Sequence, residues 1–199
     1  MSDNPQSAFI MTVSGVNFDL TNPSGSDFRF IDGVAGITRA CRFGGQISEE
    51  FADHIYSVAQ HSCYVHDLLL MFGHDRAALW GLMHDFLEGY FSDTITPIKR
   101  LLPLLTEMED RAANLLCSQW GIPRSMTIDE RVHWADQVMG CVEAFRLKER
   151  HQAQEMYDCE NPPITMSQID PDFHCWSPLT ARKQFTARYQ RAKKTAMEQ

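Results

Sequence analysis

The segment LMHDFLEGYFSD, residues 82–93, places ionisable side chains among large apolar ones. His84 and Asp85 lie between Met83 and Phe86, and Glu88 follows His84 by about one helical turn. Burying unpaired charges costs several kcal/mol, so a folded chain tolerates them only where a partner offsets the cost. That partner is either a metal ion or a buried hydrogen-bonded network, and these residues alone leave both interpretations open.

Two further His-Asp dipeptides provide a comparison within the same chain. His66-Asp67 lies in the middle of a predicted helix, where a half-exposed pair is ordinary. His74-Asp75 follows Gly73 at a helix junction, where Asp75 is better explained as the N-cap of the next helix. Neither dipeptide is predicted to bind a metal.

Imidazole and carboxylate groups together suit a divalent ion such as Mn, Co, Zn or Fe better than an ion that prefers thiolate ligands. His61 and Asp136 are the candidates to complete a site with His84-Asp85, because they would bring ligands from three different helices into the centre of a bundle. His133 is the rival of Asp136, but it lies off the apolar stripe of its helix and is predicted to be on the surface.

The elements that must position these side chains are mostly helical. Alternating apolar residues over 9–20 predict a short hairpin, and three helices are expected over 31–43, over 58–73 and from about Asp75 to Phe91. Ser57 and Gln60 form a capping-box pattern in front of the second helix. His61 therefore falls in its first turns.

The second half of the chain shows further helix signals. Thr96-Pro97 predicts an N-cap followed by proline at the first helical position, and Pro103 interrupts that segment. Capping-box patterns at Thr106 and Thr127 predict helices that end near Gly121 and Arg150. The second of these, about 128–150, carries an apolar stripe: Ile128, Val132, Ala135, Met139 and Val142. An irregular segment after Tyr157 and a last helix over 178–194 complete an all-α fold, which we expect to be one domain over 1–199 with its core at about 30–150.

Composition excludes several classes of function. Eighteen Lys and Arg against 26 Asp and Glu give a net charge of -8, the wrong sign for binding polymeric nucleic acid or an anionic membrane. No apolar run approaches the roughly 20 residues that span a bilayer, and MSDNPQSAF lacks the features of a signal peptide, so a cytoplasmic protein is expected. The six cysteines include no CxxC pair, which argues against a zinc ribbon or a thiol redox motif.

Four segments together resemble the HD superfamily of metal-dependent phosphohydrolases, named for its ligand set of His, His-Asp and a distant Asp. These segments are ITRACRFGG, YSVAQHS, LMHDFLEGYFSDTITPIKRLLP and HWADQVM. They look like the bacterial 5′-deoxynucleotidases and phage dATP triphosphohydrolases of that superfamily, over roughly residues 9–148. The resemblance implies a single HD-domain helical bundle.

The resemblance also implies roles for individual residues. His61, His84, Asp85 and Asp136 would hold one divalent metal ion, which could be Mn, Co, Zn, Fe or Mg. Glu88 and Asp93 would orient the attacking water and transfer protons. The substrate-binding residues would be Arg42 on the phosphate, Phe43 near the sugar or base, and Lys99 close to the phosphates. Gln46 stands where relatives often have His, and the segment after it looks longer than usual, which puts the substrate specificity in doubt.

The activity implied by the resemblance is cleavage of the P–O5′ bond of a deoxynucleoside 5′-phosphate, with a deoxynucleoside monophosphate as the expected substrate. The alternative within this class is release of triphosphate from a dNTP, dATP above all. An alternative of another class is a non-catalytic regulator that binds a nucleotide on the HD scaffold. The expected partner is a small-molecule deoxynucleotide, and a homo-oligomer is expected in which Phe173 and Trp176, taken as exposed, pack on a neighbouring copy.

Overall fold

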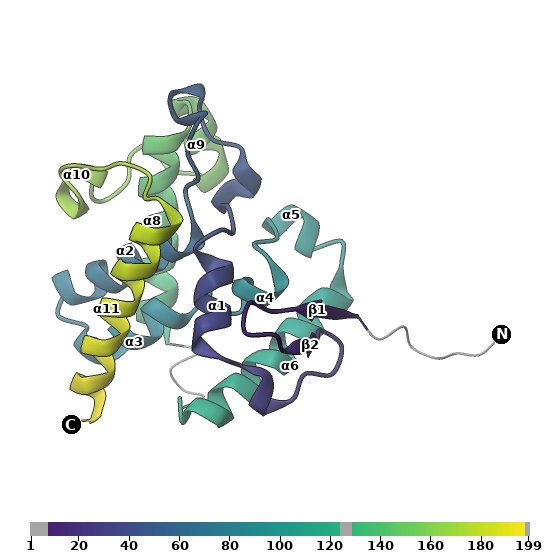
Figure 1. Ribbon diagram of the computed structural model, residues 1–199. Coiled ribbons are helices and arrows are strands. Elements are labelled where there is room, and N and C mark those ends of the chain that lie inside the picture. Colours follow the sequence, from purple (N-terminus) through teal and green to yellow (C-terminus); the bar gives the residue numbers. More distant parts are fainter. Residues whose placement is uncertain (1–7, 124–128, 198–199) are drawn as a thin grey trace.

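A computed structural model of the chain describes residues 8–123 and 129–197. These residues form helices and one short two-stranded hairpin (Figure 1). The predicted fold class, all-α with an N-terminal β-hairpin, is confirmed.

The hairpin pairs β1 (Phe9–Met11) with β2 (Asn17–Asp19) in antiparallel register. Gly15 adopts a positive φ of 80° in the turn, a conformation that glycine reaches without a steric penalty. Phe18 is fully buried, and its ring stacks on Tyr90 with 4.4 Å between the ring centroids. This contact holds the hairpin against the helices that carry the candidate site.

The helices surround one hydrophobic core. Their bounds are α1 Phe30–Ile37, α2 Val58–Met71, α3 Asp75–Met83, α4 Glu88–Phe91, α5 Thr96–Lys99, α6 Pro103–Trp120, α8 Glu130–Leu147, α9 Arg150–Tyr157, α10 Met166–Ile169 and α11 Pro178–Met197. Three short 3-10 helices lie at Gly25–Asp27, Arg42–Gly45 and Glu49–Phe51. The C-terminal helix α11 contacts α1, α2 and α3, and its Phe185 is fully buried (Figure 1). The core therefore extends beyond the expected residues 30–150.

The helix predicted from about Asp75 to Phe91 is interrupted in the structure. Helix α3 ends at Met83, a turn follows over residues 84–87, and α4 begins at Glu88. Phe86 anchors this turn because its fully buried ring packs 5.0 Å from Trp120 and 6.0 Å from Phe30, centroid to centroid. Burial of that ring outweighs the helical preference of the surrounding residues.

A close backbone approach holds α4 against α1. A Cβ atom on Gly36 would overlap the backbone of Gly89, and one on Gly89 would overlap the backbone of Gly33. Only glycine at these positions allows the two helices to touch backbone to backbone. This packing places Glu88, the first residue of α4, at a defined position.

The predicted helix over 31–43 ends early, at Ile37. The chain then pairs with the segment that precedes α2: Arg42 N donates to Tyr56 O, and Val58 N donates to Ala40 O. These inter-segment hydrogen bonds replace the helical ones and end the helix. As a result, Arg42 follows an extended stretch and lies beside the start of α2.

Helix α3 begins at Asp75, as predicted, although its N-cap is His74 rather than Asp75. Two other predicted helix starts are displaced: α5 begins at Thr96 after Ile95, and α6 begins at Pro103 rather than at Thr106. Thr127 and Ile128 lie outside the described residues. Asp129 caps α8, since its side chain accepts a hydrogen bond from Arg131 N. Helix α8 ends at Leu147, before the predicted end near Arg150, and α9 begins at Arg150.

Trp176 and Phe173 are not the exposed pair that the sequence led us to expect. Trp176 is only 8% exposed, and its ring lies 5.3 Å from that of Tyr64, centroid to centroid. Its backbone N–H donates to the side chain of Gln60, and Phe173 is half-buried against Phe51. Gln60 thus anchors this segment instead of completing the capping box. The two aromatic side chains that were expected to contact a neighbouring copy instead contact residues of the same chain.

No helix among residues 8–123 and 129–197 combines the length and apolar character needed to cross a membrane.

Candidate metal centre

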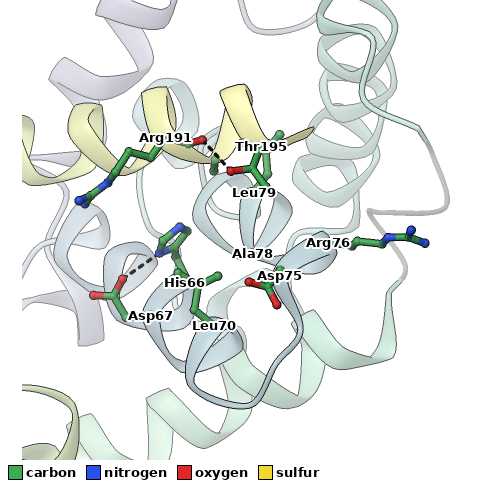
Figure 2. Close-up of a pocket in the computed structure, with 10 residues that line it drawn as sticks. His66, Asp67, Leu70, Asp75, Arg76, Ala78, Leu79, Arg191 and Thr195 are labelled. Atoms are coloured by element: carbon green, nitrogen blue, oxygen red, sulfur yellow. Dashed lines mark hydrogen bonds and ion pairs between the residues drawn. The ribbon is translucent and has the colours of Figure 1, made fainter. Parts of the chain in front are cut away.

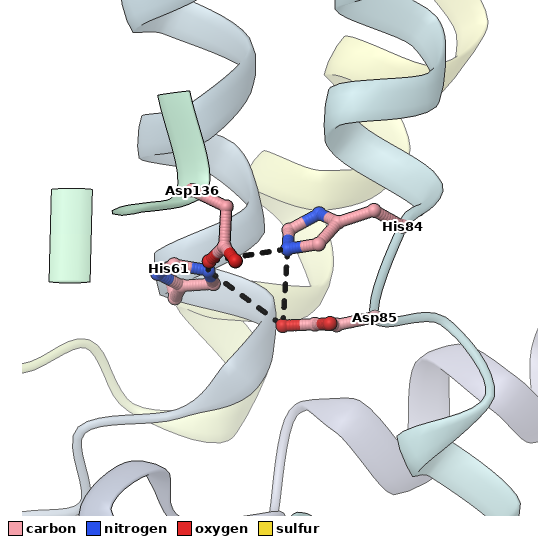
Figure 3. A group of neighbouring side chains, drawn as sticks. All are labelled: His61, His84, Asp85 and Asp136. Carbon is pink, nitrogen blue, oxygen red and sulfur yellow. Dashed lines mark ion pairs between the residues drawn. The ribbon is translucent and has the colours of Figure 1, made fainter. Parts of the chain in front are cut away.

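Four side chains predicted to bind a metal converge at one place (Figure 3). We call His61, His84, Asp85 and Asp136 the His/Asp cluster. His61 belongs to α2, His84 and Asp85 to the turn after α3, and Asp136 to α8. One ligand atom from each lies within 4.8 Å of the others, a spacing that allows all four to hold one metal ion.

The contacts inside the cluster alternate between imidazole and carboxylate. His61 Nε2 lies 3.1 Å from Asp136 Oδ1 and 3.6 Å from Asp85 Oδ2. His84 Nε2 lies 3.1 Å from Asp85 Oδ2 and 3.6 Å from Asp136 Oδ1. Both Nε2 atoms are buried, yet neither makes a hydrogen bond to any of the described residues. Nitrogen atoms that face carboxylate oxygens without hydrogen bonding to them fit metal ligands.

The other nitrogen of each imidazole ring determines the tautomer. His61 Nδ1 lies 2.7 Å from Glu143 Oε1, and His84 Nδ1 lies 2.7 Å from the carbonyl oxygen of Gly81. A carbonyl can only accept a hydrogen bond, so His84 Nδ1 must carry the proton that it donates. In a neutral ring this leaves the lone pair on Nε2, directed into the cluster.

The first turn of α2 positions His61. Ser57 caps the helix by accepting a hydrogen bond from Gln60 N at 3.2 Å, as predicted. His61 is therefore the fourth helical residue, and its ring is completely buried. Asp136 comes from the opposite direction, on α8, and its side chain keeps 35% of its surface exposed.

Electrostatics within the cluster favour ionised carboxylates and, without a bound ion, a protonated His84; a metal ion bound at Nε2 would replace that proton. Burial alone would lower the pKa of His84, but Asp85 and Asp136 outweigh it and hold the pKa well above its usual range. Burial likewise opposes ionisation of Asp85, but His84 outweighs it and lowers the pKa to about 2. The carboxylates therefore remain ionised at neutral pH, which suits them to bind a cation.

A surface pocket gives access to the cluster. Its volume is about 400 Å³, and His84 and Asp136 form part of its wall together with Trp80 and Val132. This volume falls within the range of small-molecule sites. The cluster is therefore reachable from outside.

Arg42, predicted to bind phosphate, lies at the edge of the cluster. Its Nη1 is 3.4 Å from Asp85 Oδ2, and its Nη2 is 3.8 Å from Glu143 Oε2. The Nε atom is buried without a hydrogen-bond partner among residues 8–123 and 129–197. The guanidinium group thus has donor capacity left for a ligand.

Glu88, predicted to be catalytic, begins α4, and Asp93, also predicted to be catalytic, lies two residues after its end. Burial, together with the charges of Asp85 and Asp93, raises the pKa of Glu88 well above its usual range. Glu88 Oε2 is buried and has no hydrogen-bond partner within the part of the chain that the structure describes. Burial also raises the pKa of Asp93, against the charge of Arg42. Both groups are carboxylates that exchange protons more readily near neutral pH than an exposed one.

Two residues with unusual backbone conformation flank these side chains. Phe43, directly after Arg42, has a φ of 58°, and Ser92, directly before Asp93, has a φ of 66°. A positive φ costs free energy for residues other than glycine and often marks functional sites. Phe43 is next to Arg42 and Ser92 is next to Asp93, so both unusual conformations adjoin candidate site residues.

Lys99, predicted to lie near the phosphates, reaches toward Glu88 but pairs with another residue. Its Nζ is 4.0 Å from Glu88 Oε1 and 3.1 Å from Glu109 Oε1. Burial would lower the pKa of Lys99, but Glu109 and Glu88 outweigh it and raise the pKa. Glu109, on α6, lies three residues after Thr106 and belongs to the capping-box pattern predicted there.

Phe43, predicted to lie near the sugar or base, is next to two cations. Arg42 Cζ lies 5.7 Å from the centre of its ring, and Lys148 Nζ lies 5.1 Å from it. Lys148 also donates a hydrogen bond to the backbone oxygen of Gln46. The segment after Arg42 is thus tied to the end of α8, close to the cluster.

Glu143 is the residue near the cluster that sequence reasoning missed. It lies seven residues after Asp136 on α8 and is completely buried. The signal was present: a residue two helical turns from Asp136, four after Met139, lies on the same face as the apolar stripe. A carboxylate on that face is a charge among apolar residues, like Asp136, which lies four residues after Val132 and three before Met139.

The side chains predicted to lie outside the metal site do so, although His66 is buried (5% exposed) rather than half-exposed. His133 is exposed and interacts with Gln137 at 2.9 Å, and Asp75 is exposed at the start of α3. His66 and Asp67 line a separate pocket of about 460 Å³ between α2, α3 and α11 (Figure 2). Among the described residues, the group of at least three side chains arranged to hold a metal is the His/Asp cluster.

Comparisons with known proteins place the chain among its relatives. No protein-family model matches it. It is 29% identical over 141 residues to the uncharacterized protein RCAP_rcc00048 of Rhodobacter capsulatus, over 68% of the chain and 70% of that relative. It is 33% identical over 132 residues to the uncharacterized protein YfdR of Escherichia coli, over 66% of the chain and 68% of the relative. The chain belongs to the same family as E. coli YfdR.

Proposed function

We propose that the protein is an HD-superfamily phosphohydrolase that cleaves the P–O5′ bond of deoxynucleoside 5′-monophosphates. One observation carries this proposal: two imidazoles and two carboxylates from three parts of the chain present four ligand atoms within 4.8 Å of one another. Of the predicted substrate and proton-transfer side chains, Arg42 lies 3.4 Å from Asp85, and Lys99 lies 4.0 Å from Glu88. Motif resemblance supplies the deoxynucleotide as the substrate class.

A divalent ion held by the His/Asp cluster would polarise the phosphoryl group and lower the pKa of an attacking water. The other residues have separate tasks. Arg42 presents a planar set of donors that matches phosphate oxygens. Glu88 and Asp93 are the carboxylates placed to remove a proton from the water and to protonate the departing oxygen.

The reaction balances with water as the co-reactant. The water oxygen forms a bond to phosphorus, the P–O5′ bond breaks, and its electron pair leaves with O5′. A proton from the water reaches O5′ through the carboxylates. The products are a deoxynucleoside and inorganic phosphate.

The charges around the cluster favour a monophosphate over a triphosphate. Arg42 already faces Asp85 and Glu143, and Lys99 is paired with Glu109. Two additional phosphate groups would have to compete with these carboxylates for the same cations. Release of triphosphate from a dNTP remains the second candidate, because Lys99 would become available if the substrate displaced Glu109.

The experiment incubates the purified protein with Mn²⁺ or Co²⁺ and a panel of deoxynucleoside mono- and triphosphates. Nucleoside, phosphate and triphosphate are separated by chromatography. We expect nucleoside and phosphate from the monophosphates. Release of nucleoside with triphosphate would favour the second candidate. Nucleotide binding without any product would instead favour a non-catalytic nucleotide-binding regulator.

A further inference from the structure

Glu143 is a completely buried carboxylate on α8. An ionised carboxylate in that position is costly unless several groups stabilise it. The side chains around Glu143 therefore indicate the role of its negative charge. The two oxygen atoms of Glu143 face two different side chains.

The first oxygen, Oε1, lies 2.7 Å from Nδ1 of His61, whose ring is also completely buried. A carboxylate only accepts, so the hydrogen lies on Nδ1. The opposite ring nitrogen, Nε2, then directs its lone pair at the His/Asp cluster. Carboxylates that bind the outer nitrogen of a metal-binding histidine fix its tautomer and orientation, and they raise its basicity as a ligand.

The second oxygen, Oε2, faces Arg42 Nη2 at 3.8 Å. It has no hydrogen-bond partner among the described residues. Arg42 also reaches Asp85, a member of the cluster, at 3.4 Å. Glu143 is therefore placed between a metal-binding histidine and the arginine proposed to bind phosphate.

We infer that Glu143 is a positioning residue, which holds His61 in the Nδ1–H tautomer and keeps the Arg42 guanidinium beside the cluster. The inference rests on the proposed function, since it assumes that the cluster binds an ion. Glu143 touches neither the ion nor the substrate in this role. It links the two ends of the site through one buried charge.

The test measures binding of Mn²⁺ to the metal-free protein by titration calorimetry. Glu143→Gln keeps the size of the side chain and removes its charge. We expect Kd to rise by about 10- to 100-fold, the usual effect of losing such a partner. Glu50→Gln is the matched control, because Glu50 pairs with Arg146 on the surface, and its Kd should equal that of the wild type.

A spectroscopic measurement separates positioning from a general structural effect. In the Zn²⁺-loaded protein, the Nδ1 proton of His61 should resonate far downfield because it forms a charge-assisted hydrogen bond. Glu143→Gln should move this resonance upfield. An unchanged resonance together with an unchanged Kd would overturn the inference.

A second variant covers the case in which Glu143→Gln folds poorly, as judged by its melting temperature. Glu143→Asp retains the charge at a shorter reach, and we expect its Mn²⁺ affinity to lie between those of the wild type and the Gln variant. Affinity as strong as in the wild type, or no better than in the Gln variant, contradicts a role for a charge at this distance. If the wild-type protein binds no Mn²⁺, the proposed function itself is contradicted.

Discussion

The same dipeptide, His-Asp, occurs at residues 66–67 and 84–85 with opposite outcomes. Asp67 receives the guanidinium of Arg188 from α11, with Nε at 2.9 Å and Nη2 at 2.6 Å. Asp85 instead faces Asp136 across two histidine nitrogens. Arg188 neutralises the first carboxylate, whereas the second, although Arg42 lies 3.4 Å away, shares its place with another carboxylate and could hold a cation from outside.

The histidines differ in the same way. His66 Nδ1 is hydrogen-bonded to the adjacent Asp67 at 2.8 Å, so the pair is satisfied locally (Figure 2). His84 Nδ1 is bound to the Gly81 carbonyl, and its Nε2 faces the cluster (Figure 3). The comparison teaches that a His-Asp pair becomes a candidate metal site only when a distant element supplies a further carboxylate.

The strongest test of this difference replaces the histidine of each pair. His84→Ala removes a ligand, so we expect Mn²⁺ affinity to fall by at least about 100-fold, beyond the usual loss for a supporting residue, and turnover to fall to background. His66→Ala should leave both unchanged. Calorimetry and the nucleotidase assay measure them, and equal losses in the two variants would remove the distinction between the pairs.

The residue three positions after each pair provides the next test. It is Glu88 after Asp85, but Leu70 after Asp67. Glu88→Gln should lower kcat by about 10²- to 10⁴-fold, the usual contribution of a proton-transferring group, while Mn²⁺ affinity remains. Glu107→Gln, on the exposed surface of α6, is the control and should retain kcat. Full activity of the Glu88 variant would exclude Glu88 from proton transfer.

Arg188→Ala tests the closed pair, by which we mean His66-Asp67 with its carboxylate bound to Arg188, through its effect on stability. It leaves Asp67 partly buried without its cation, so the free energy of unfolding should fall by about 1–3 kcal/mol, with no change in Mn²⁺ affinity. Arg131→Ala breaks an ion pair at a half-exposed arginine and should cost less than Arg188→Ala. Urea denaturation of the metal-free proteins gives both values. A stability loss in the Arg188 variant no larger than in the Arg131 variant would show that the closed pair contributes little.

The smallest expected effect is the dependence of that pair on pH. Burial would raise the pKa of Asp67, but hydrogen bonds from His66 and Arg188 outweigh it and lower the pKa. A lowered carboxylate pKa contributes stability above the pKa of the unfolded chain, and this is lost as pH falls through the folded value. The difference in unfolding free energy between wild type and Asp67→Asn should therefore shrink from neutral to acidic pH. A difference independent of pH would show that the charge of Asp67 is not what stabilises the pair.

Residue types and spacing were sufficient to predict the fold class and the four members of the His/Asp cluster. Periodicity identified the helices, and a charged residue on an apolar face identified His84, Asp85 and Asp136 as a group that needs a partner. These signals are local, because each depends on residues within a few turns of one helix.

Local patterns could not predict where the helices stop. The break after Met83 depends on burial of Phe86 against Trp120, and the end of α1 depends on pairing of its following segment with residues 56–58. The same holds for Trp176, which the sequence placed on the surface and the structure buries beside Tyr64. Each outcome depends on a contact between distant parts of the chain.

The sequence by itself determined an all-α chain with a hairpin and an excess of charged groups on apolar faces. Only the tertiary structure decided which of those groups meet. It brought Arg188 to Asp67, Asp136 to His84, and Glu143 to His61. The reason is physical: the free energy of a buried charge depends on the charges and donors within a few ångströms of it, and helix packing alone sets those distances.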